Sequence, residues 1–149
     1  MLNFGILSGI LILALLAFNV AKEKTEFNVV TLEAESVAQR VAGVVVGAAL
    51  LYEQYDIQAY AREVQLPEQF EGRDYTITLA ANTVTVAVPS MGVTVTEPLF
   101  SVGQIVELCS QTIGGGPLTV RLTDTPGAPD ICGEPDEDAL PYMVHLEET

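Results

Sequence analysis

The residues that could support catalysis are few and poorly placed. The single histidine, His145, lies in an alternating segment four residues from the C-terminus, and no sequence neighbour would make it a general base. A packed or surface histidine with a structural role is the expectation. None of the serines stands in the Gly-x-Ser-x-Gly context of a hydrolase nucleophile. We therefore predict that the chain is not an enzyme.

Motifs for cofactors and metals are also missing. Gly114–Gly116 is followed by Pro117, so this run lacks the Lys-Ser/Thr pair and the helix start of a phosphate-binding loop. The acidic run Asp136–Asp138 could ligate a hard cation such as calcium, but it lacks EF-hand spacing, and a solvated acidic loop is the alternative. The sequence has no Cys-x-x-Cys and no His/Cys zinc spacing. We expect no cofactor and no metal.

The two cysteines, Cys109 and Cys132, both lie in the C-terminal half. If that half is extracytoplasmic, a disulfide between them would close a loop of about 24 residues and stabilise it by roughly 3 kcal/mol on the chain-entropy model. Two unrelated buried thiols are the alternative. We predict the disulfide, because a small β domain has a marginal core.

Charge and apolar residues are segregated along the chain. The formal net charge is -14, yet 49% of the residues are hydrophobic and the mean hydropathy is +0.36. Residues 1–21 carry no charge, whereas the segment from Leu66 onward has 13 acidic and two basic residues. Such a surface repels phosphate backbones, so we expect no nucleic-acid partner. Scarce lysine with many carboxylates favours a protein of a halophile; an ordinary acidic secreted protein is the alternative.

The elements that carry these residues begin with a long apolar helix. Met1–Ala21 is long enough to cross a bilayer core, and no basic residue precedes it as in a secretory signal. Either it is an unusual signal anchor, or a short charged leader has been removed and Met1 is the mature N-terminus, which is our expectation. No proline occurs before Pro67, so we predict continuous helix for about 60 residues, over 1–64.

An apolar seam runs along the upper part of this helix at alternating spacings of three and four. The Gly43-x-x-x-Gly47 spacing suits close approach of a second helix, and Val41–Tyr52 is apolar on every face. A helix folded onto its own β domain would account for one of these faces, and a multi-helix bundle would account for all of them. We predict helix–helix packing through Phe27, Val30, Val37, Val41, Gly43, Val44, Gly47 and Leu51.

After Pro67 the periodicity changes from helical to alternating, which predicts a small, antiparallel, β-sandwich-like head over 65–149. The pattern in Phe100–Cys109 fits a strand or a short helix equally well, and 124–141 has the composition of a loop. The fold class is therefore α+β. The expected strands are Tyr75–Leu79, Val84–Val88, Val93–Thr96, Leu118–Leu122 and Tyr142–Leu146.

The whole chain resembles an archaeal type IV pilin or archaellin in organisation: an uncharged N-terminal stretch, an unbroken helix and a C-terminal β head. The segment Leu66-Pro67-Glu68 … Gly72-x-x-Tyr75-Thr76-Ile77 is similar to small pilin-related proteins of halophilic archaea. The chain departs from bacterial pilins at residue 5, where it has Gly instead of Glu, and at Lys22, where they often have proline. The basic leader of a prepilin is not part of the sequence.

The resemblance implies a structural subunit of an extracellular filament. It implies a helical homopolymer with helices bundled inside and β heads outside, used for adhesion or another surface role. It also implies insertion in the cytoplasmic membrane before assembly, a prepilin peptidase and a pilus assembly machinery. The alternative is a single-pass membrane-anchored surface protein, or a minor pilin-like subunit, whose β domain binds a partner.

Overall fold

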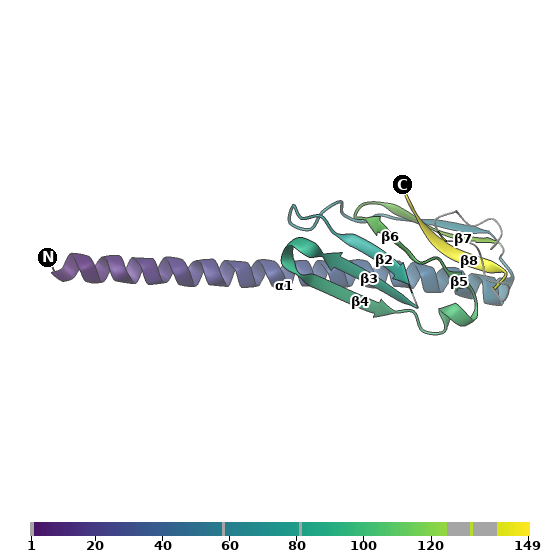
Figure 1. Cartoon of the computed structure of the whole chain (residues 1–149), viewed down its shortest axis with the longest axis horizontal. Coiled ribbons are helices and arrows are strands. Elements are labelled where there is room, and N and C mark those ends of the chain that lie inside the picture. The colour runs from purple at the N-terminus through teal and green to yellow at the C-terminus, as the bar shows by residue number, and fades with distance from the viewer. Residues whose placement is uncertain (1, 58, 81, 125–131, 133–139) are drawn as a thin grey trace.

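The computed structural model describes residues 2–57, 59–80, 82–124, 132 and 140–149, with side chains from residue 9 onward. One long helix, α1 (Leu2–Tyr55), is followed by two four-stranded β-sheets. The N-terminal half of α1 projects from the head, and its C-terminal half lies alongside the sheets (Figure 1). The predicted α+β class, a long helix followed by a small β head, is confirmed.

The helix ends earlier than the sequence predicts. Asp56 has a left-handed backbone (φ 51°), and its N–H donates to the carbonyl of Tyr52 (2.9 Å), which closes the last turn. The segment Tyr60–Val64, predicted as helix, instead forms strand β1. It pairs along its whole length with a strand in the last third of the chain, over Leu118–Leu122. This long-range pairing outweighs the weak helix propensity of the segment. The boundary at residue 64 is corrected accordingly: helix stops at Tyr55.

One sheet contains the predicted meander. Its strands are β2 (Thr76–Ala80), β3 (Thr83–Val88), β4 (Val93–Pro98) and β6 (Gln111–Gly114), in the order β4-β3-β2-β6. Every second residue of β2 and β3 is buried, whereas the threonines between them point outward and pair across strands, as Thr78 with Thr112 (2.8 Å) and Thr85 with Thr96 (3.1 Å). The alternation of apolar residues and threonines in the sequence therefore predicts correctly which face of this sheet is buried and which is exposed. β6 was not predicted.

The other sheet joins distant parts of the chain. Its strands are β1, β7 (Leu118–Asp124), β8 (Tyr142–Glu148) and β5 (Glu107–Leu108), in the order β1-β7-β8-β5. β7 and β8 are the last two predicted strands, slightly longer than expected, whereas β5 lies parallel to β8. The ambiguous segment Phe100–Cys109 contains both β5 and a 3-10 turn, η2 (Val102–Gln104). Another 3-10 turn, η1 (Pro89–Met91), links β3 to β4.

The core lies between α1 and both sheets. The helix contacts β3 and β4 on one side, and β1, β7 and β8 on the other. Small and β-branched helix residues alternate there, which lets the helix approach the valines of the sheets closely. The buried helix residues are Val30, Ala34, Val37, Ala38, Val41, Ala42, Val44, Val45, Ala48 and Ala49.

Cys109 and Cys132 form a disulfide. Cys109 is buried next to β5, and its backbone N–H donates to the carbonyl of Val144 in β8 (3.0 Å). The bond therefore links Cys132 to the residue that follows β5, the edge strand of the β1-β7-β8-β5 sheet. The acidic run Asp136–Asp138, with most of the loop predicted for 124–141, lies outside the described residues.

Candidate functional site

The projecting half of α1 is apolar and exposed. Each of its large apolar side chains between residues 10 and 20 is 56–68% exposed. Residues 2–26 extend about 37 Å at the standard helical rise, which exceeds the roughly 30 Å core of a bilayer. By length and composition, Gly9–Tyr55 could cross a membrane, a property it shares with signal sequences and with core helices of soluble proteins. These exposed side chains are Ile10, Leu11, Ile12, Leu13, Leu15, Leu16, Phe18 and Val20.

The predicted apolar seam faces the head of its own chain. Val30, Val37, Val41 and Val44 are buried between the helix and the sheets. The assignment of these four valines to packing between helices is therefore corrected: within one chain they already contact β-strands, whose inner faces present complementary valines and leucines. At the ends of the seam, Phe27 is 45% exposed and Leu51 is half-buried. The seam thus fastens the head to the helix.

The opposite face of the helix carries the glycine pair. Gly43 is exposed and Gly47 half-buried, and no atom of the described residues lies within 4 Å of a Cβ built on either, apart from the helix's own backbone. Leu32 (64% exposed) and Leu50 (40% exposed) lie on the same side at helical spacing. We call this stripe, Leu32, Gly43, Gly47 and Leu50, the outer face. Within one chain, the predicted close approach at Gly43 and Gly47 has no partner among the described residues.

A groove of about 340 Å³ runs beside the outer face. One wall is the helix edge formed by Val46, Leu50 and Glu53, and the other is the segment from Phe100 to Ile105. Phe100 is 81% exposed, and the backbone of the next residue, Ser101, is left-handed (φ 63°). Sequence reasoning missed Phe100, because a single aromatic in a segment without clear periodicity gives no signal of exposure.

Three arginines make contacts that hold the parts of the head together. Arg73 pairs with Glu26 (3.8 Å) and Arg40 donates to the carbonyl of Gln65 (3.0 Å), and both contacts tie α1 to the loop before β2. Lys22 lies one turn before Glu26, 3.6 Å from it. In the other sheet, Arg121 of β7 pairs with Glu147 of β8 (2.5 Å). These contacts are partly exposed, so each contributes little stability by itself.

The single histidine of the chain lies buried in β8. His145 is 2% exposed, and its Nε2 lies 3.2 Å from the Glu147 carboxylate. Burial by itself would raise the pKa of Glu147, but hydrogen bonds from His145 and Arg121, together with their charges, outweigh it and lower that pKa. The cluster joins β7 to β8, which are neighbouring antiparallel strands.

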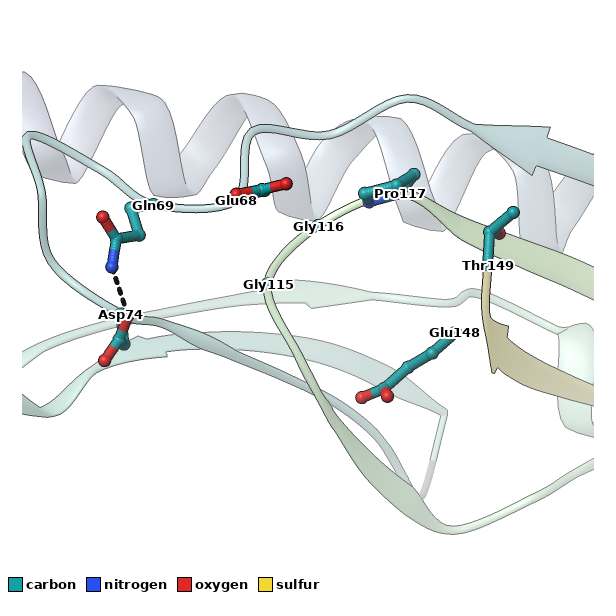
Figure 2. A pocket seen from close by; sticks show the side chains of 8 residues that line it. All are labelled: Glu68, Gln69, Asp74, Gly115, Gly116, Pro117, Glu148 and Thr149. Atoms are coloured by element: carbon teal, nitrogen blue, oxygen red, sulfur yellow. Dashed lines mark hydrogen bonds between the residues drawn. The ribbon is translucent and has the colours of Figure 1, made fainter.

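An open hollow of about 490 Å³ has an acidic rim, contributed by Glu68, Asp74 and Glu148 (Figure 2). Two of these carboxylates accept hydrogen bonds from the protein: Asp74 from the Gln69 amide (2.7 Å), and Glu148 from the backbone N–H of Gly114 (3.1 Å). Within the described ranges, no three His, Cys, Asp or Glu side chains are grouped so that they could hold a metal ion. The hollow is therefore an open acidic surface feature.

Comparison with known proteins gives one match. A family model described as a family of unknown function (DUF7266) matches residues 4–132, which covers most of α1 and most of the head. No curated protein and no solved structure matches the chain. The matched region thus contains nearly all of α1 and the strands β1 to β7, whereas β8 (Tyr142–Glu148) lies beyond it. The chain belongs to the DUF7266 family.

Proposed function

We propose that the chain is a non-catalytic structural subunit of an extracellular filament resembling a type IV pilus. The observation that carries this proposal is the exposed apolar surface of the projecting helix, eight large side chains between residues 10 and 20. Fully burying one such side chain is worth roughly 1.5–3 kcal/mol, so covering all eight, each 56–68% exposed, is worth on the order of 10 kcal/mol per subunit. A chain with this surface requires lipid or other apolar helices around it.

Two environments satisfy this requirement in succession. Before assembly, residues 1–21 lie in the cytoplasmic membrane with the head outside. On assembly, they exchange lipid for the helices of neighbouring copies, and the acidic heads coat the filament. The outer face supports this arrangement, because Gly43 and Gly47 leave room for a second backbone where the chain itself places none of its described atoms. A prepilin peptidase and an assembly machinery follow from the resemblance to archaeal pilins, and the net charge of -14 argues against nucleic-acid partners.

A single-pass surface protein, or a minor pilin-like subunit, is the second candidate. This candidate is favoured by the burial of the four seam valines, Val30, Val37, Val41 and Val44, against the head. Because of that burial, a single chain exposes much less apolar helix surface to water outside the membrane. The two candidates differ at the outer face. A filament subunit covers it with other copies, whereas a lone anchored protein leaves it in contact with solvent.

Imaging and mass spectrometry of the cell surface distinguish the two. We expect negative-stain images of cells that produce the chain to contain filaments, and tryptic peptides of the β head to dominate the purified filament. Deletion of the gene should remove those filaments. Cells that keep the chain entirely in the membrane fraction, with no filament containing it, would contradict the proposal and support the anchored protein.

A further inference from the structure

One wall of the groove beside Phe100 is a regular helix edge. Val46, Leu50 and Glu53 follow one another at spacings of four and three, so two apolar side chains and then a carboxylate point along one side of α1. Glu53 is exposed at the end of the groove nearer the C-terminus of the helix. A matching helix would therefore carry two apolar side chains followed by a cation, over a stretch of eight residues.

The projecting half of the same chain presents that pattern. Leu15, Phe18 and Lys22 lie on one face of α1 at spacings of three and four, and together they also span eight residues. Leu15 is 56% exposed, Phe18 66%, and the side chain of Lys22 63%. Both segments thus have the order apolar, apolar, charged along the chain, and their charges are opposite in sign.

We propose that the groove binds residues 15–22 of a second copy of this chain, parallel to α1, with Leu15 beside Val46 and Lys22 beside Glu53. The proposal rests on the filament proposed above and specifies one of its contacts. Its offset of 31 residues corresponds to an axial displacement of about 47 Å between the two copies. Phe100 then closes over the side of the incoming helix and covers Phe18.

The negative charge of Glu53 favours residues 15–22 as the bound segment over other parts of a second copy. The chain has 20 acidic and 6 basic residues, so most surfaces of another head would bring carboxylates toward Glu53. Residues 1–21 carry no charge, and Lys22 is the first basic residue after them. An antiparallel helix with Lys22 beside Glu53 would carry Leu15 past Tyr55, beyond the end of α1, and leave Val46 uncovered. Only the parallel orientation places Leu15 beside Val46 and Lys22 beside Glu53 at the same time.

Cysteine pairs test the register in assembled filaments. In the variant L15C/V46C, oxidation should join neighbouring subunits and give a ladder on a non-reducing gel, because facing positions come within disulfide range. The control pair L11C/V46C is shifted by one helical turn, about 6 Å, and should give no ladder. Filaments in which the control pair forms the ladder and L15C/V46C does not would overturn the proposed register.

A charge exchange tests the polar end without altering the apolar contact. E53K should lower filament yield at low salt by about fivefold, since it replaces an attraction to Lys22 with a repulsion. The double variant K22E/E53K should recover the yield. K24E makes the same charge change on another face of the helix and should not rescue E53K. Recovery by K24E, or none by K22E, would contradict the contact.

The results of these experiments distinguish a failure of the proposed register from a failure of the filament proposal. Filaments that form normally from the original chain, yet show neither the L15C/V46C ladder nor the charge rescue, remove the register and leave the filament proposal intact. If the original chain forms no filament, the failure lies with the proposed function.

Discussion

Replacement of Gly47 by leucine should have opposite effects on the single chain and on the assembly. Within the chain, no described atom outside the helix's own backbone lies within 4 Å of an added Cβ, and leucine forms helix better than glycine by about 0.8 kcal/mol. The melting temperature of the detergent-solubilised chain should therefore rise by about 2–6 °C. The substitution is predicted to stabilise the subunit.

Between chains the same leucine fills the space that a second backbone requires. Overpacking at a close contact costs about 1–3 kcal/mol, which lowers the association constant roughly 5- to 150-fold. Filaments counted by negative-stain microscopy should thus be rare or absent, although the chain is present at its usual level. The matched control is Gly47→Ala, which gains a similar helix propensity but adds only a methyl group, and it should lose far fewer filaments.

Two results would refute this reasoning. Filaments of normal number and diameter from Gly47→Leu would mean that the outer face at Gly47 meets no neighbour. A melting temperature lowered by several degrees would mean that the leucine disturbs the packing of the helix on its own head, and the loss of filaments would then reflect folding.

Three further predictions concern the head. Replacing Cys109 and Cys132 together by serine should lower the free energy of unfolding by roughly 3 kcal/mol, measured by denaturant titration of the chain in detergent; an unchanged midpoint would contradict a stabilising role for the disulfide. Val41→Ala should cost about 1–3 kcal/mol in the same assay, because Val41 is fully buried between α1 and the sheets, whereas Val29→Ala, at a 37% exposed position, should cost much less. The lowered pKa of Glu147 contributes stability that is present above the ordinary value of 4.5 and is lost as the pH falls through the folded value. Glu147→Gln should therefore weaken the acid sensitivity of the melting temperature, and an identical pH profile would argue against the contacts with His145 and Arg121.

The sequence predicts best where a pattern is both long and local. The helix through Tyr55 and the strands β2, β3, β4, β7 and β8 follow from runs whose periodicity has one interpretation. β1 and β6 are different, because each forms by pairing with a partner far away in the chain, β7 for β1 and β2 for β6. Neither Tyr60–Val64 nor Gln111–Gly114 has a strong pattern of its own, so local reasoning extended the helix over the former and missed the latter.

The candidate site could be predicted only in part. Periodicity identified the seam, but it cannot tell whether an apolar face meets a neighbouring helix or the sheet of its own chain, since both demand the same residues. The glycine pair was assigned by its small size, and the structure leaves that side of the helix open. The groove depends on the loop around Phe100, whose position is set by the packing of Leu99 and Val102 beneath it, and no spacing in the sequence encodes it.

The continuity of α1 has a mechanical consequence. The helix has no proline, and it runs without interruption from Leu2 into the core of the head. It is also fastened there by the valine seam and by the Glu26–Arg73 pair just below it. The head and the projecting segment are therefore joined by one continuous helix and should move as a rigid body, without a hinge between them. The lipid or the neighbouring helices that surround the first twenty or so residues therefore fix the direction in which the acidic head points. A sideways force on the head is transmitted along the helix as a torque on those surroundings.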